Sequence, residues 1–249
     1  MDDKKPIAII AIAIVVFLSG GAWWMSRRKP APQNATPAVV TGTEAPIDKS
    51  DGAVNLPPLD QMDGFLRPLL SALSSRPELA QWLATDDLVG QLAAAIDLAA
   101  AGASPARDFK VIAPASRFVA AGRGSRRTID AVSYRRYDGL VETVTSIDAA
   151  SVGRIYKTIR PRLNEAYQRS GNPTGNVDNA LLKAIDILLD TPVVKDPIPI
   201  VEDGKAGWVY ADDELEELLP TQKQLLRMGS ANVEKLLAWL RALRTALQS

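Results

Sequence analysis

The sequence opens with an uncharged apolar segment, residues 7–25, and this segment restricts the chain more than any other feature. Its nineteen residues would form a helix about 28 Å long, close to the thickness of the hydrocarbon layer of a bilayer. Two tryptophans end the segment and three cations follow it, as is typical where a helix leaves the lipid. We therefore predict a membrane anchor over residues 1–29, with these anchor residues: Ile7, Phe17, Trp23, Trp24, Arg27 and Arg28.

A cleaved signal peptide is the alternative for this segment, because Gly20 and Ala22 resemble a small-residue cleavage site. The tryptophans and cations directly downstream favour an uncleaved, single-pass anchor. Positive charge does not orient the anchor, since each flank carries three cations when the terminal amine is counted. We expect the rest of the chain to lie outside the cytoplasm, because the long spacer that follows suits an extracytoplasmic stalk.

Residues 30–55 are predicted to be a linker. They contain four prolines among alanine, threonine, serine and glycine, and they show no apolar periodicity. From residue 56 the apolar residues follow helical spacing, so residues 56–249 are predicted to form one α-rich globular domain. Short runs around the turns at 122–124 and 202–205 predict one or two small β-hairpins in this mostly α domain.

The predicted helices include two that contain proline. Pro68 should kink or break the first helix, and Pro161 should interrupt the backbone hydrogen-bond ladder within a helix over 148–170. Another helix is expected over 132–147. The last helix carries an apolar seam, for which packing in the core is favoured over a coiled coil because the seam spans barely two heptads: Val233, Leu236, Leu240, Leu243 and Leu247.

Two polar motifs suggest ligand-binding sites, but a structural role in the fold explains each of them better. Asp86 and Asp87 could be a cation-binding pair, yet Mg²⁺ or Ca²⁺ needs a spaced set of oxygen ligands, so Asp86 is predicted to cap a helix instead. The arginines of the segment 134–138 could grip a phosphate. Anchoring of this segment to a carboxylate such as Glu165 explains it as well, and we favour that structural interpretation.

The chain has no cysteine and no histidine. It therefore lacks a disulfide, a thiolate nucleophile, a Ser-His-Asp triad and an imidazole metal ligand. We predict no catalytic residue, no metal site and no cofactor. The 29 cations balance 29 acids, so no net field draws the chain to nucleic acid, which we do not expect as a partner.

Charge is nevertheless segregated along the chain. The basic segment, residues 107–136, has eight cations and two acids, whereas the acidic segment, residues 202–217, has seven acids and one cation. These segments either face each other, form solvated surfaces, or bind a partner, with the basic one gripping an anionic group. If it binds, the candidate interaction surface is Arg107, Arg123, Arg126, Arg127, Arg135 and Arg136.

Six stretches resemble a bacterial family catalogued as domain of unknown function 3014. They are LPPLD (56–60), WLATDDL (82–88), SPAR (104–107), SYRRYD (133–138), RPRLNEAY (160–167) and KQLLRMG (223–229). The resemblance covers essentially the whole predicted domain. It implies an N-terminal anchor, a Pro-rich spacer and a helical body, and it implies no reaction.

These features predict a single-pass protein of the bacterial inner membrane with its body in the periplasm. We expect a non-catalytic interaction or structural module that binds an unknown protein or another anionic envelope partner. One alternative is a carboxylate-dependent hydrolase acting on an envelope polymer, since two carboxylates can cleave a glycosidic bond without histidine. Another is attachment of the domain to anionic lipid. The sequence does not indicate an oligomeric state.

Overall fold

The computed structural model describes residues 55–104, 114, 116–124, 126–204 and 207–249. The predicted anchor, nearly all of the linker and Arg107 lie outside these residues, so their structure stays a prediction. Within the described part of the chain, no helix is both long and apolar enough to cross a membrane.

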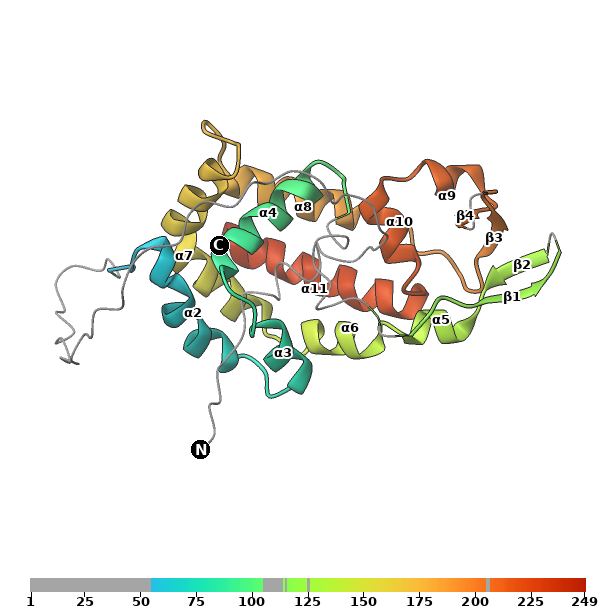
Figure 1. Ribbon diagram of the computed structural model, residues 1–249, viewed down its shortest axis with the longest axis horizontal. Coiled ribbons are helices and arrows are strands. Elements are labelled where there is room, and N and C mark those ends of the chain that lie inside the picture. The colour runs from blue at the N-terminus through green and yellow to red at the C-terminus, as the bar shows by residue number, and fades with distance from the viewer. Residues whose placement is uncertain (1–54, 105–113, 115, 125, 205–206) are drawn as a thin grey trace, which may run out of the picture. The chain divides into compact units, whose positions relative to one another are not determined.

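The described chain is mostly helical, which confirms the predicted class (Figure 1). A 3₁₀ turn, η1 (Leu59–Gln61), precedes the α-helices. The α-helices are α2 (Met62–Ser71), α3 (Pro77–Trp82), α4 (Leu88–Ala100), α5 (Ala131–Arg135), α6 (Asp138–Thr145), α7 (Ala149–Arg169), α8 (Val177–Leu189), α9 (Asp213–Glu217), α10 (Pro220–Leu226) and α11 (Ser230–Gln248).

The main core lies where α4, α7, α8 and α11 pack together. The predicted seam of the last helix faces this core, with Val233, Leu236, Leu240 and Leu243 each at most 1% exposed, so the prediction of core packing is confirmed. Helices α7 and α11 approach closely, because a Cβ placed on Gly153 would lie 3.0 Å from the Cβ of Ala246. Just before α7, the Ile147 carbonyl accepts a 2.7 Å hydrogen bond from the Trp239 indole of α11.

The prediction of a break at Pro68 is wrong. Helix α2 continues through Pro68. The predicted helix over 148–170 is confirmed as α7, which contains Pro161. Proline removes one backbone donor and crowds the preceding turn, but apolar residues on both sides of it are buried. In α2 these are Leu66 and Leu70, so packing of the helix against the core outweighs the lost hydrogen bond.

The helix expected over 132–147 is two helices, α5 and α6. The break has a packing reason, since Tyr134 belongs to a small cluster beneath the sheet whereas Tyr137 belongs to the main helical core. On one continuous helix, residues three apart would lie on the same face. Ending α5 at Arg135 allows the two rings to enter different cores.

Both predicted hairpins are present, and they join into one antiparallel sheet in the order β1-β2-β3-β4. The strands are β1 (Ala120–Arg123), β2 (Arg126–Ile129), β3 (Pro199–Glu202) and β4 (Trp208–Tyr210). The joint between the hairpins is the pairing of Arg127 with Ile200, extended by a 2.9 Å hydrogen bond from the Ile129 N–H to the Ile198 carbonyl. This pairing was not predicted.

The buried stripe of α7 gives a stability prediction. Leu163 is 0% exposed, so Leu163→Ala should lower the free energy of unfolding by about 2–5 kcal/mol through lost contacts and a cavity. Leu69→Ala is the matched control, because Leu69 is 41% exposed and its truncation should cost less than about 1 kcal/mol. Urea unfolding followed by circular dichroism measures both variants, and equal losses would contradict this packing.

Candidate functional site

The tip of the β1–β2 hairpin brings two arginines of the basic segment face to face. Arg123 and Arg126 are directly paired across the two strands, and both are exposed. Side chains that lie opposite each other in an antiparallel pair share one face of the sheet, and like charges in this arrangement are destabilising. No described acidic side chain forms an ion pair or hydrogen bond with either arginine. This uncompensated pair is the strongest site signal in the described chain.

The two faces of the sheet differ in burial. On the inner face, Ile129, Ile200 and Tyr210 are at most 4% exposed and pack with Tyr134 and Leu226. Strand alternation places a second set of residues on the opposite face, and each of these is half-buried or exposed. We call this set the outer face: Ala121, Arg123, Arg126, Thr128, Pro199, Val201 and Val209.

Arg127 lies on the inner face and serves the fold. Its guanidinium is 3.5 Å from the Glu202 carboxylate and lies 5.0 Å from the centre of the Trp208 ring. Both partners belong to the acidic segment, so the two charged segments do contact each other at this point. Arg127 therefore connects β2 to the second hairpin. Its guanidinium is engaged in these internal contacts and is not a purely solvent-facing cation.

Arg136 is also used internally. It donates hydrogen bonds of 3.0 Å to the Ser116 carbonyl and 3.1 Å to the Ser133 carbonyl, and its guanidinium lies near the rings of Phe118 and Tyr137. Arg135, the last residue of α5, is exposed, and its side chain forms no hydrogen bond or ion pair among the described residues. The structure thus brings together Arg123 and Arg126, and it places Arg127, Arg135 and Arg136 in other surroundings.

The acidic segment forms an exposed surface around α9. Asp212 caps this helix by accepting a hydrogen bond from the Leu215 N–H, and Glu216 pairs with Lys223 at 2.6 Å. Burial alone would raise the pKa of Glu216, but the bonds from Lys223 and from the Tyr210 N–H lower it. Three further acidic side chains of α9, from Asp213, Glu214 and Glu217, are exposed and have no cationic partner among the described residues. With the exposed cap they form what we call the acidic helix surface: Asp212, Asp213, Glu214 and Glu217.

Tyr134 joins the sheet to the helices. Its hydroxyl accepts a 3.0 Å hydrogen bond from the Ile198 N–H. The side chain lies against Gly229, which has a φ of 83° and where a Cβ would lie only 2.9 Å from Tyr134 Cγ. Burial raises the pKa of Tyr134 to about 12, and the nearby Asp196 carboxylate adds to the effect. The hydroxyl is therefore neutral at physiological pH.

Tyr137 and Asp138 also have structural partners. The Tyr137 hydroxyl accepts a 2.8 Å hydrogen bond from Gln224, and Asp138 accepts one of 2.8 Å from Asn232. The expected partner Glu165 is instead paired with Arg162 and Arg169. The predicted anchoring of the arginines to a carboxylate is therefore wrong: Arg136 bonds backbone carbonyls instead, and Tyr137 and Asp138 hold the segment to α10 and α11.

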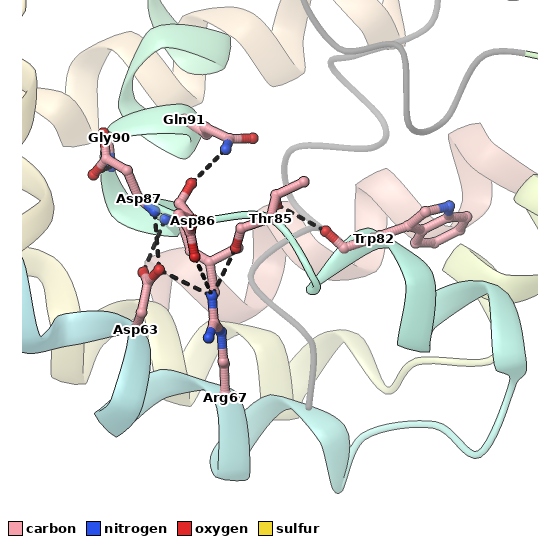
Figure 2. Close-up of polar contacts among 9 residues, drawn as sticks. Asp63, Arg67, Trp82, Thr85, Asp86, Asp87, Gly90 and Gln91 are labelled. Atoms are coloured by element: carbon pink, nitrogen blue, oxygen red, sulfur yellow. Dashed lines mark hydrogen bonds and ion pairs between the residues drawn. The ribbon is translucent and has the colours of Figure 1, made fainter. Parts of the chain in front are cut away.

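A second polar cluster surrounds the start of α4 (Figure 2). The Asp63 carboxylate accepts hydrogen bonds of 2.9 Å from the N–H groups of both Asp87 and Leu88. It also pairs with Arg67, which in turn donates to the Thr85 carbonyl at 2.8 Å. Asp63, from α2, therefore satisfies backbone donors of another helix.

The helix cap of α4 is Asp87 rather than the predicted Asp86. Asp87 adopts a left-handed conformation (φ 56°) and accepts a hydrogen bond from the Gly90 N–H. The Asp86 carboxylate is 98% exposed and contacts Arg67. Among the described residues, no group of three or more acidic side chains is arranged to hold a metal ion.

Two further carboxylates have shifted pKa values. A hydrogen bond from Arg76 lowers the pKa of Glu142, and a hydrogen bond from Ser151 lowers the pKa of Asp148. Together with Glu216, these groups are held in the ionised form. A general acid in glycoside hydrolysis needs a carboxyl whose pKa is raised, so these three residues do not suit that role.

The Asp63 cluster gives a second stability prediction. Asp63→Ala should lower the free energy of unfolding by about 2–4 kcal/mol, because it leaves two backbone N–H groups without acceptors and removes a partner of Arg67. Asp86→Ala is the matched control and should cost less than about 1 kcal/mol, since an exposed ion pair contributes little. Thermal and urea unfolding measure the difference. A cost as large for Asp86→Ala would show that the helix start depends on Asp86 instead.

Comparison with known proteins gives one match. The sequence profile of a family described as Protein of unknown function (DUF3014) matches residues 88–244. No curated protein and no solved structure matches the chain. The matched range includes α4 to most of α11 and the whole sheet, and it extends over more than half of the chain. The chain therefore belongs to the DUF3014 family of proteins of unknown function.

Proposed function

We propose that this protein is a single-pass, membrane-anchored protein of the bacterial cell envelope whose helical domain is a non-catalytic interaction module. The domain binds an anionic partner through the outer face of its sheet. Arg123 and Arg126 are the cations that make this contact. The anchor, residues 1–29, and the linker keep the domain close to the inner membrane on its periplasmic side.

One observation carries the binding proposal. Arg123 and Arg126 lie opposite each other, exposed, and without an acidic partner among the described residues. The neighbouring Arg127 shows that the fold can supply a carboxylate and an aromatic ring to a cation of the same strand. A like-charge pair costs stability, and an anionic ligand would remove that cost.

The anchor proposal rests on the sequence alone. The uncharged segment has the length of a membrane-spanning helix, tryptophans lie at its end, and cations follow it. The hydrolase alternative has no comparable support, because the three described carboxylates with shifted pKa values are shifted downward.

The location of the domain gives a prediction that uses the lack of native cysteine. A single cysteine introduced at Thr43, in the linker, should react with a membrane-impermeant maleimide in cells whose outer barrier has been made permeable. Labelling before lysis is the expected result. Labelling only after lysis would place the domain in the cytoplasm and contradict the periplasmic location.

The binding surface gives a further prediction. A photoreactive amino acid at Thr128, on the outer face, should form an adduct with the partner in cells that express the full chain. Arg123→Ala with Arg126→Ala should reduce this adduct about five- to tenfold, as expected for the loss of two exposed charge contacts.

The control removes the same charge elsewhere. Lys235 and Arg241 are exposed cations of α11, so Lys235→Ala with Arg241→Ala should leave the adduct unchanged. An adduct that is equally reduced in both double variants would reflect net charge alone. The absence of any adduct in the unsubstituted chain would refute the proposed surface.

A further inference from the structure

We propose that the partner of the outer face is the acidic helix surface of a second copy of this chain. The inference rests on the proposed function and deepens it by naming the anionic partner. Two copies would pair through the same two surfaces, with the outer face of each copy against the acidic helix surface of the other.

Charge complementarity is the first argument. The charged members of the outer face are Arg123 and Arg126, both positive. The acidic helix surface contributes exposed carboxylates from Asp213, Glu214 and Glu217, which have no cationic partner among the described residues. Each surface therefore carries the charge that the other one needs, and close juxtaposition of opposite charges guides and fixes association.

Position is the second argument. Helix α9 follows β4 directly and packs beside it, at the same end of the domain as the β1–β2 hairpin (Figure 1). A uniformly anionic surface that approached the sheet, such as a phosphatidylglycerol membrane, would meet the carboxylates of α9 as well as the arginines. A partner that carries both charges avoids this repulsion, and a second copy of the chain is such a partner.

The position of both surfaces at one end of the domain is also compatible with a dimer that has a two-fold axis. In a two-fold dimer, residue i of one copy contacts residue j of the other, and the reverse contact forms at the same time. Two complementary surfaces at one end of the domain therefore make two contacts in a single encounter.

Apolar side chains beside these charges support a protein partner. Val201, on the outer face, is 39% exposed, and Leu219, which follows α9, is 41% exposed. A protein interface has an apolar core and a polar rim, and these apolar side chains could supply part of such a core. Exclusion of water in turn strengthens the charge contacts.

Disulfide trapping between two tagged copies tests the proposal, again because the chain has no native cysteine. One full-length copy carries Thr128→Cys on the outer face, and the other carries Ala211→Cys, an exposed position directly before the acidic helix surface. Mild oxidation of membranes that contain both copies should produce a cross-linked heterodimer. High salt should reduce its yield, because exposed charge contacts are screened.

Charge reversal makes the test specific. Placing R123E and R126E in both copies should reduce the heterodimer about tenfold or more, and D213K with E214K in both copies should do the same, since like-charge juxtaposition costs several kcal/mol. Combining the R123E/R126E copy that bears Thr128→Cys with the D213K/E214K copy that bears Ala211→Cys restores opposite charges. This combination should recover the heterodimer, and K235E with R241E should leave it unchanged.

The outcomes separate this proposal from the one on which it rests. If no heterodimer forms, or if the combined reversal does not restore it, a second copy is not the partner. An adduct at Thr128 with a different protein, still dependent on Arg123 and Arg126, would overturn the self-association and leave the proposed function standing. The same holds if the full chain binds phosphatidylglycerol vesicles through these arginines without forming a heterodimer.

Discussion

The candidate site depends on the pairing of β2 with β3. A two-stranded hairpin is at best marginally stable alone, and each hairpin here contributes only short strands. Their union places Ile129 and Ile200 against Tyr134 on one side of the sheet and leaves Arg123 and Arg126 on the other. The division into a structural and an exposed face thus follows from one backbone register.

The stretches that resemble the family serve the same architecture. Tyr137 and Asp138 of SYRRYD bind Gln224 and Asn232, in and just beyond KQLLRMG. Arg162 of RPRLNEAY donates hydrogen bonds to the carbonyls of Leu56 and Pro57, in LPPLD. The stretches that resemble the family therefore contact one another, and these contacts determine how the segments that carry them pack together.

Much of the fold could be predicted from the sequence, because helical spacing and turn residues are local signals. The seam of the last helix and the turns of both hairpins are examples. The continuity of α2 through Pro68 could not be predicted, since it depends on tertiary packing that local rules omit. The sequence also did not indicate which arginine of the β1–β2 hairpin is structural and which is exposed. In Arg126-Arg127, adjacent residues point to opposite faces of a strand, and only the register shows which face is buried.

The separation of β2 from β3 along the sequence has a consequence for the order of folding. The paired residues Arg127 and Ile200 lie 73 positions apart, and α5, α6, α7 and α8 occupy the interval. Contacts between such distant segments form late, after local structure has shortened the effective loop. We therefore expect the four-stranded sheet, with its buried and exposed faces, to form only after the helices between the hairpins are in place. Binding through the outer face, as proposed above, would then require the completed fold.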